Sequence, residues 1–441
     1  MLRRIARMTA AALLCLLLAG CAANVATDQL YALPRLPAEY ESLEQQINAL
    51  LSDGAEHVAP NSGGNLQSVQ MVDLDGDGVE EAVAFFRKST DERPMKIYFF
   101  KSNGESYERL ALIEGTASSL YSIAYTDLDG DGQREILVGF KSGSEVQALS
   151  VYSLRGSEPL NLLTTAYARY AVSDLDGDGR QELTVFYSGE ENSCMADCYA
   201  WADRELSRLS TLELSFPASE LSRVAAGPLS DGGSALYVTG VADNSVAAYD
   251  ILTVKNGVLQ NILQSTASSA VDGGFRFLSL YPSDVDGDGV IEVPEPVAFP
   301  TLDDDSETYY RIHWRAYDST GGSKVVRRTF HNAADGWSLT LPEAWDESIS
   351  LLRTVTESEN AVLFFRCDHE ECQPVLEICA LTGSSREEHA LRGDRFVLAR
   401  QVETVYTAEL IPCDDWPGNV DEETVKGSFS LIVSEWTTGE N

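Results

Sequence analysis

The hexapeptide "DLDGDG" occupies residues 73–78 and recurs at 127–132 and 174–179, and the variant "DVDGDG" follows at 284–289. Three carboxylates within six residues repel one another unless a cation or hydrogen-bond donors compensate them. A short run rich in β-branched and aromatic residues precedes each copy, and another follows it, which is typical of two strands joined by a turn. The repeated stretch therefore predicts a repeated β unit, and its acidity requires a separate explanation.

The copies are spaced as a repeated unit would be. Their first aspartates are 54, 47 and 110 residues apart, and the last interval is about twice one unit. The missing unit is recognisable at 224–238, "VAAGPLSDGGSALYV", where Leu236 aligns with Leu183 and Asp231 aligns with Asp178. We therefore expect five units of about four strands each. Units of this length stack as the blades of a β-propeller, and unrelated hairpins with similar turns are the alternative.

The acidic residues have the spacing of a cation-binding loop. Counted from the first Asp, carboxylates stand at positions 1, 3, 5 and 9, glycine at position 6, and position 7 offers its backbone carbonyl. Calcium takes six to eight oxygen ligands, whereas magnesium requires a tighter octahedron and soft metals prefer sulfur or imidazole. We therefore predict structural calcium, up to four ions. The predicted ligands are Asp73, Asp75, Asp77, Val79 and Glu81; Asp127, Asp129, Asp131, Gln133 and Glu135; Asp174, Asp176, Asp178, Arg180 and Glu182; and Asp284, Asp286, Asp288, Val290 and Glu292.

The acid at position 9 replaces the acid at position 12 that closes a helical calcium hand. Position 12 is Ala84, Val138, Val185 and Glu295 in the four copies. The competing interpretation is that Asp and Gly merely form good turns, without any metal. The degenerate unit carries Gly227, Leu229 and Asp231 at positions 1, 3 and 5, so we expect no ion there.

The motif D-x-D-G-D-G-x-x-E, present four times, resembles the FG-GAP/VCBS repeats of integrin-type β-propellers. The resemblance covers about residues 64–325 and implies a propeller with calcium in loops between adjacent strands of a blade. Two departures from that pattern stand out. The degenerate unit lacks the acids, and Pro294 and Pro296 are expected to break the strand after the last copy. Whether five blades close the ring stays open.

The N-terminus predicts export and anchoring. Residues 1–21 combine a basic start with an apolar stretch too short for a stable membrane span. Their end, "LLAGC" at 17–21, resembles the lipobox of bacterial lipoprotein signal peptides, which implies cleavage before Cys21 and a diacylglycerol on its sulfur. A simple secretory signal is the alternative. Within 22–63 we expect a tether followed by an amphipathic helix at 37–52. The protein would then lie on the outer side of the cytoplasmic membrane or on the cell surface.

Six further cysteines are present, and an even number in an exported chain suggests disulfides. Cys194 and Cys198, in "CMADC", are the most plausible local pair. The set Cys367, His369, Cys372 and Cys379 lacks the paired spacing of familiar zinc sites. Disulfides or buried free thiols are therefore preferred to zinc, and the pairing of the cysteines, Cys413 included, stays open.

Residues 326–441 lack the hexapeptide and alternate strand-like runs with a late helix-like stretch at 421–429, "DEETVKGSF". They predict a small α+β domain. This part weakly resembles small bacterial domains of the PsbP type, and no function is implied by that resemblance.

The composition excludes some functions and leaves two. A net charge of -37 repels nucleic acids and anionic lipid surfaces. No H-E-x-x-H, G-x-S-x-G or phosphate-binding glycine loop is present, so no catalytic residue is predicted. Four tryptophans could line a sugar site, although tryptophan more often lies in a core: Trp201, Trp314, Trp337 and Trp345. The expected function is a calcium-stabilised binding or scaffold module for a protein or glycan, and the alternative is an exported enzyme acting on polysaccharide.

Overall fold

The computed structural model describes residues 38–432 except 144–145, 157, 243–245, 264–279, 303–307, 346–347, 369–370 and 414–415. The predicted signal peptide, Cys21, the tether and His369 lie outside the described residues. The described part is mainly β, as expected, and consists of antiparallel sheets that follow one another along the chain. In the described part, no helix has the length and apolar character needed to cross a membrane.

A helix precedes the first sheet and packs against it. Helix α3 (Ala38–Ser52) confirms the predicted amphipathic helix. It buries Leu43 against Ala82, Phe86 and Phe100 of the first sheet. The strands of this sheet are β1 (Glu56–His57), β2 (Val69–Val72), β3 (Glu81–Arg87), β4 (Met95–Ser102) and β5 (Tyr107–Gly115).

The next three sheets each have four strands in simple sequence order. The second contains β6 (Ser119–Thr126), β7 (Glu135–Ser142), β8 (Val146–Ser153) and β9 (Leu160–Ala166). The third contains β10 (Arg169–Ser173), β11 (Glu182–Ser188), β12 (Ser193–Ala202) and β13 (Glu205–Pro217), and the fourth contains β14 (Arg223–Pro228), β15 (Ser234–Ala242), β16 (Val246–Lys255) and β17 (Val258–Asn261). Short 3-10 turns lie at Glu190–Asn192 and Ala218–Glu220.

Two five-stranded sheets complete the described chain. The fifth is β18 (Val293–Ala298), β19 (Tyr310–Tyr317), β20 (Ser323–Asn332), β21 (Trp337–Thr340) and β27 (Phe429–Leu431). The sixth is β22 (Ile349–Val355), β23 (Glu359–Asp368), β24 (Glu371–Leu381), β26 (Val405–Leu410) and β25 (Phe396–Arg400), with α4 (Arg386–His389) and α5 (Glu422–Ser428) beside it. Helix α5 lies in the predicted late helical stretch, and Asp421 caps it by accepting from Thr424 N at 2.8 Å. The boundary expected at 325–326 falls inside β20.

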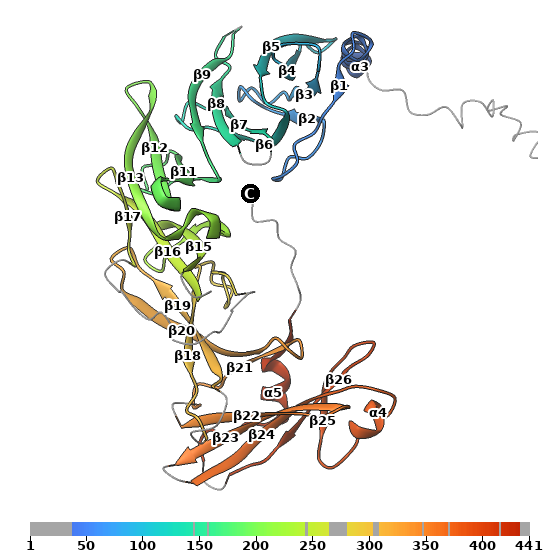
Figure 1. The fold of residues 1–441 in the computed structure, drawn as a ribbon, viewed down its shortest axis with the longest axis vertical. Coiled ribbons are helices and arrows are strands. Elements are labelled where there is room, and N and C mark those ends of the chain that lie inside the picture. The colour runs from blue at the N-terminus through green and yellow to red at the C-terminus, as the bar shows by residue number, and fades with distance from the viewer. Residues whose placement is uncertain are drawn as a thin grey trace, which may run out of the picture.

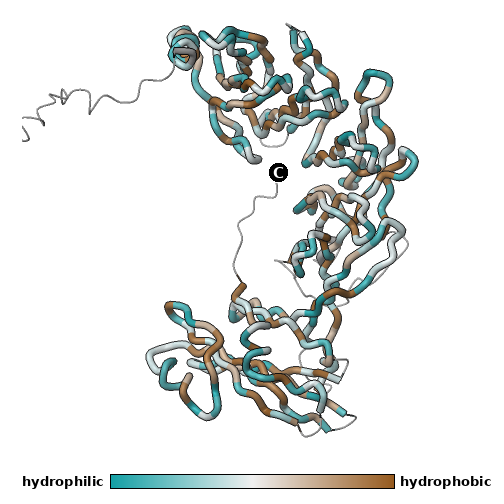
Figure 2. The backbone as a smooth tube through the Cα atoms, turned by 180° about the vertical axis from the view of Figure 1, so that it is seen from behind, coloured by the Kyte–Doolittle hydropathy of each residue, from teal (hydrophilic) through white to brown (hydrophobic). Residues whose placement is uncertain are grey.

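Neighbouring sheets pack face to face through shared cores. Val83 of the first sheet shares a core with Val138 of the second, and Leu137 on the other face of the second sheet shares one with Val185 of the third. The same arrangement continues to the fourth and fifth sheets. Figure 1 shows the sheets placed one after another along an arc, and Figure 2 shows hydrophobic residues concentrated within their strands.

The first five sheets form a row, and other elements cover both ends of this row. Helix α3 packs on the face of the first sheet that points away from the second. At the other end, Phe330 and Trp337 of the fifth sheet share a core with Phe364 of the sixth. Since each end face already has its own cover, closure of the first five sheets into a propeller ring is not confirmed.

The expectation that prolines break the strand after the last hexapeptide is wrong. Strand β18 runs through Pro294 and Pro296, and it pairs with β19 along its whole length. The two prolines are two residues apart, so both backbone nitrogens face the same side. They lie on the edge of the sheet, where the missing N–H costs no ladder hydrogen bond.

The predicted Cys194–Cys198 pair is also wrong. Both residues lie on β12, where positions four apart are separated by about 13 Å, far beyond disulfide reach. Both thiols are free and buried. A disulfide instead joins Cys367 to Cys372, which face each other across β23 and β24. This bond removes two thiolates from the disfavoured zinc set, and Cys379 and Cys413 are free and buried.

Candidate metal-binding loops

Each acidic hexapeptide joins two antiparallel neighbouring segments of one sheet. We name these loops by their sheet: loop 1 (residues 73–81), loop 2 (127–135), loop 3 (174–182) and loop 5 (284–292). In loop 1, β2 ends just before Asp73 and Glu81 begins β3. The loop thus starts on one strand and ends on its antiparallel partner, with Val72 opposite Glu81.

The first aspartate organises the backbone of the loop. In loop 1 the Asp73 carboxylate accepts hydrogen bonds from Gly76 N at 2.8 Å and Gly78 N at 3.1 Å. Gly78 has a φ of 83°, a conformation that favours glycine. At position 7, Val79 N donates to the Asp77 carboxylate at 2.8 Å. The same hydrogen bonds recur in loops 2, 3 and 5.

The glutamate at position 9 closes each loop from inside the protein. Glu81, Glu135 and Glu292 are fully buried, and Glu182 is 2% exposed. One carboxylate oxygen of each accepts the backbone N–H of position 2, at 2.7–3.0 Å. The other oxygen, Oε1, is buried without a hydrogen-bond partner in Glu81, Glu135 and Glu292.

Burial disfavours the charged form of these glutamates. It raises the pKa of Glu135 and of Glu182 to about 7, against the hydrogen bond from the backbone that lowers it. The pKa values of Glu81 and Glu292 are raised for the same reason. A carboxylate in this environment is stabilised when it binds a proton or a cation.

The folding brings together three of the five predicted ligands in every loop. Oxygens from positions 1, 3 and 9 lie within 4.8 Å of one another, and these groups could hold a metal ion. The four groups are Asp73, Asp75 and Glu81; Asp127, Asp129 and Glu135; Asp174, Asp176 and Glu182; and Asp284, Asp286 and Glu292. Positions 5 and 7 do not belong to these groups.

Two basic side chains that the sequence analysis did not single out reach into these clusters. Lys101 Nζ contacts Asp75, and it lies 3.0 Å from Asp77 and 3.7 Å from Glu81. Arg155 makes the corresponding contacts in loop 2. Cross-strand register would have found Lys101, since Ala82 pairs with Phe100 and Glu81 therefore faces Lys101.

In the fourth sheet the equivalent connection is loop 4 (Pro228–Ser234), which contains no acidic cluster. Loop 4 lies between the paired residues Gly227 and Ala235 and is one residue shorter than the stretch between Ser173 and Glu182 in loop 3. Leu229 is buried, like the leucine at position 2 of loops 1, 2 and 3. The expected frame, with Gly227 and Leu229 at positions 1 and 3, is therefore shifted by one residue.

Asp231, the acid that loop 4 retains, binds the next sheet. Its carboxylate accepts from Ser319 N at 3.0 Å and from Ser319 Oγ at 2.6 Å. It also accepts from Gly233 N at 3.3 Å. Donors of the protein therefore satisfy this carboxylate, and these bonds lower its pKa.

A fifth acidic group lies in the sixth sheet and is already balanced. Glu359, Glu377 and Cys379 approach one another, and Arg395 Nη2 lies 2.6 Å from Glu359 and 3.2 Å from Glu377. Burial raises the pKa of the Cys379 thiol, so this thiol is neutral near pH 7. The group is best described as a partly buried ion-pair network.

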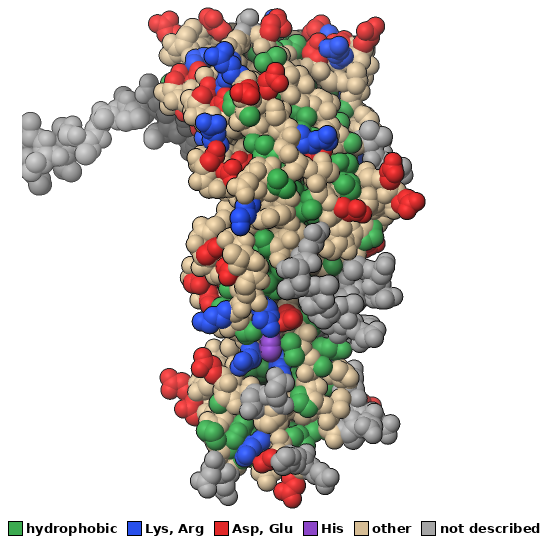
Figure 3. All heavy atoms as spheres, turned by 90° about the vertical axis from the view of Figure 1, so that its left-hand side faces the viewer, with side chains coloured by type: hydrophobic (Ala, Val, Ile, Leu, Met, Phe, Trp, Pro, Cys, Tyr) green, Lys and Arg blue, Asp and Glu red, His purple; other side chains and the backbone are tan. Residues whose placement is uncertain are grey.

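The tryptophans lie mostly in cores. Trp314, Trp337 and Trp345 are buried, which confirms the core interpretation for these three. Trp201 is half-buried beneath the Arg155 guanidinium, whose central carbon lies 5.5 Å from the ring centroid. On the face in Figure 3, acidic and basic side chains are interspersed along the length of the molecule.

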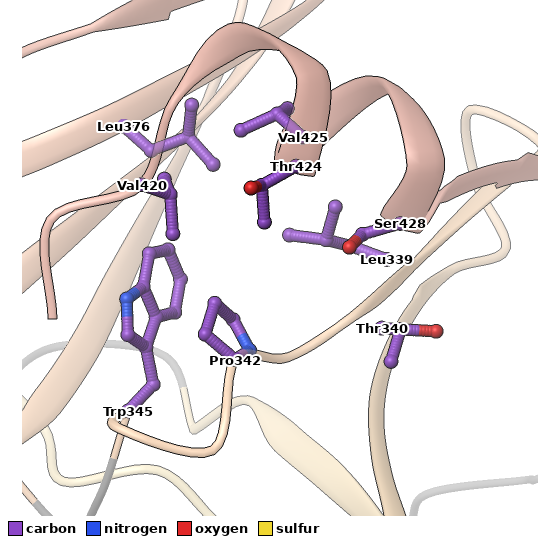
Figure 4. A pocket seen from close by; sticks show the side chains of 9 residues that line it. All are labelled: Leu339, Thr340, Pro342, Trp345, Leu376, Val420, Thr424, Val425 and Ser428. Carbon is purple, nitrogen blue, oxygen red and sulfur yellow. The ribbon is translucent and has the colours of Figure 1, made fainter.

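Two cavities lie apart from the acidic loops. The one in Figure 4 lies between α5, β21 and β24, and its lining side chains carry no titratable group. The other, of about 80 Å³, lies where the first, second and third sheets meet. Its lining combines two tyrosines and an arginine with small and polar residues: Gly63, Gly64, Asn65, Ser122, Ile123, Ala124, Tyr167, Arg169 and Tyr170. No family model and no curated protein matches this chain.

Proposed function

We propose that this protein is a calcium-stabilised, propeller-like β scaffold that binds a protein or glycan ligand outside the cell, anchored through a lipid on Cys21. The observation that carries the calcium proposal is the buried Oε1 of Glu292. It has no hydrogen-bond partner, and oxygens of Asp284 and Asp286 lie with that glutamate in one group within 4.8 Å. A buried carboxylate oxygen without a partner is disfavoured, and a divalent cation among these oxygens relieves that cost.

The donor set fits calcium. Every side-chain ligand in the four groups is a carboxylate oxygen, and neither thiol nor imidazole is among them. Calcium accepts such hard oxygen ligands in flexible geometry, and water or the carbonyl at position 7 can fill its remaining positions. When bound, the ion supplies charge compensation. It would tie the end of one strand to the beginning of the next, because positions 1 and 9 flank the turn.

The stacked four-stranded sheets support a propeller-like scaffold. Each shares a core with the sheet before it and the sheet after it, as blades do. We infer an open row of blades, since α3 covers one end and the sixth sheet covers the other.

The cavity between the first three sheets favours binding over hydrolysis. Tyr167, Tyr170 and Arg169 provide aromatic surface and positive charge, and no residue that lines this cavity is a carboxylate. Glycoside hydrolysis generally needs two carboxylates facing the scissile bond. An exported enzyme acting on polysaccharide is the second candidate, and it requires such a pair elsewhere.

Calcium binding by the full chain tests the proposal. We expect isothermal titration with CaCl₂ to show binding, and calorimetry to show a higher melting temperature with calcium than with chelator. At free calcium one hundred times the Kd, each occupied site adds about 2.7 kcal/mol to the free energy of unfolding. MgCl₂ at the same concentration is the control and should give a smaller shift. No heat of binding together with an unchanged melting temperature would refute the proposal.

A further inference from the structure

We propose that Lys101 and Arg155 are built-in counter-cations of loops 1 and 2, and that loops 3 and 5 are consequently the high-affinity calcium sites. This inference rests on the proposed calcium function and assigns it unequally among four similar sequences. It depends on what faces each loop rather than on the loop itself.

Lys101 reaches loop 1 from the neighbouring strand. It lies on β4, directly opposite the closing Glu81, so its side chain emerges on the same face of the sheet. Its ammonium contacts Asp75 and lies 3.0 Å from Asp77 and 3.7 Å from Glu81 Oε1. One positive charge therefore sits among the carboxylates of positions 3, 5 and 9, in the place where a metal ion would be coordinated.

Arg155 reaches the same three positions of loop 2 by a different route. It follows the end of β8 and contacts Asp129, and its Nη2 lies 2.9 Å from Asp131 and 3.7 Å from Glu135 Oε1. Its guanidinium also lies over the ring of Trp201 in the third sheet. Lys101 and Arg155 come from different places in the chain, yet each puts a positive charge beside positions 3, 5 and 9 of its loop.

Loops 3 and 5 have no such side chain opposite the closing glutamate. Leu183 pairs with Tyr199, so Ala200 faces Glu182, and Val293 pairs with Arg315, so Ala316 faces Glu292. Among the described residues, no ion pair involves the acids of loop 3 or loop 5.

This difference predicts two classes of site. A calcium ion that enters loop 1 or loop 2 must displace a tethered cation or share its carboxylates with it, and the like charges repel. A calcium ion that enters loop 3 or loop 5 meets carboxylates that form no ion pair among the described residues; Arg327 reaches loop 5, but its guanidinium donates to the Val285 carbonyl rather than to a carboxylate. The full chain is therefore expected to bind two ions with Kd values at least about tenfold lower than those of the remaining two.

Substitutions that exchange the two classes provide the test, with CaCl₂ titrated calorimetrically into the full chain. Lys101→Ala with Arg155→Ala removes both tethered cations, and should raise the number of tight ions from two to four. Ala200→Lys places an ammonium opposite Glu182, and should lower the number from two to one. Lys88→Ala is the matched control, since Lys88 pairs with Asp53, which belongs to none of the loops. It removes one positive charge, as each single substitution of the double variant does, and should leave two tight ions.

The outcomes separate this inference from the calcium function on which it rests. Four equivalent ions in the wild-type chain, or a double variant that still binds two, would overturn the inference and leave the calcium function standing. No calcium binding in any variant would instead overturn the function. If the double alanine variant does not fold, Lys101→Gln with Arg155→Gln retains polar contacts to the loops. Its gain of tight ions is then the deciding measurement, with circular dichroism as the check of folding.

Discussion

Loops 3 and 4 connect equivalent strands of adjacent sheets and use opposite chemistry. Loop 3 carries three aspartates and the buried Glu182, whereas loop 4 has Asp231 as its one acid and binds it to Ser319. Ser230 strengthens that contact by donating from N and Oγ to the Tyr317 carbonyl, at 2.8 and 3.0 Å. The connection in loop 4 forms with one carboxylate, so the four acids of loop 3, whose aspartates also accept backbone hydrogen bonds, exceed what this connection needs.

Among the substitutions that test the difference between loops 3 and 4, Glu182→Gln is expected to have the largest effect. The glutamine oxygen can still accept from Leu175 N, as the glutamate does at 2.7 Å, but the buried charge is lost. We expect calcium binding at loop 3 to weaken at least tenfold, which is about 1.4 kcal/mol. Without calcium the variant should unfold at a higher temperature than the wild type, because a neutral amide is less costly to bury than a carboxylate.

Titration calorimetry and thermal unfolding, each with and without chelator, measure these opposite changes. Glu213→Gln is the control, since Glu213 lies exposed on β13 of the same sheet. Calcium binding that survives Glu182→Gln undiminished would mean that loop 3 is closed by something other than its position 9 acid.

The sequence predicted the local chemistry of these loops better than their surroundings. Spacing alone placed positions 1, 3 and 9 together, because a glycine at position 6 and a strand start at position 9 fix the turn. It could not identify Lys101 or Arg155 as partners, since their places depend on cross-strand register and on the length of a neighbouring hairpin. The frame of loop 4 was misplaced because the length of this connection could not be read from the sequence either. Loop 4 is one residue shorter than loop 3, and the missing residue precedes Asp231.

Larger errors arose where a pattern has different meanings in different elements. Two cysteines four residues apart meet on a helix, but on β12 they are held far apart along one extended strand. Prolines that would break a central strand are tolerated in β18, which lies at an edge. The covered ends of the row were not predictable from the repeats, because the covering elements lie outside them.

A smaller effect is expected from pH, through Glu135 and Glu182. Their folded-state pKa of about 7 exceeds the ordinary value of 4.5, so the folded protein holds these protons more tightly than the unfolded chain. Their contribution to stability is fully present below pH 4.5 and is lost as pH rises through 7. In chelator, the melting temperature should therefore fall more steeply between pH 5 and 8 in the wild type than in Glu135→Gln with Glu182→Gln.

Calcium should reverse this trend, because it binds the deprotonated carboxylates. The rise in melting temperature on adding calcium should accordingly be larger at pH 8 than at pH 5. Thermal unfolding at both pH values, in calcium and in chelator, gives the four numbers required. Equal slopes for the wild type and the double variant would show that these glutamates are not protonated in the calcium-free protein.

The smallest effect is expected from substituting the aligned residues Asp231 and Asp178. It compares loop 4 with loop 3 most directly. Asp231→Ala removes the hydrogen bonds to Ser319 and should lower the free energy of unfolding by roughly 0.5–1.5 kcal/mol, equally in calcium and in chelator. Asp178→Ala should destabilise the protein more in calcium than in chelator, because this carboxylate is the ligand predicted at position 5 of loop 3. Denaturant unfolding of both variants in both conditions makes the comparison. If Asp231→Ala proved as sensitive to calcium as Asp178→Ala, loop 4 would have to be counted among the metal sites, and its contact with Ser319 would no longer explain why it lost the other acids.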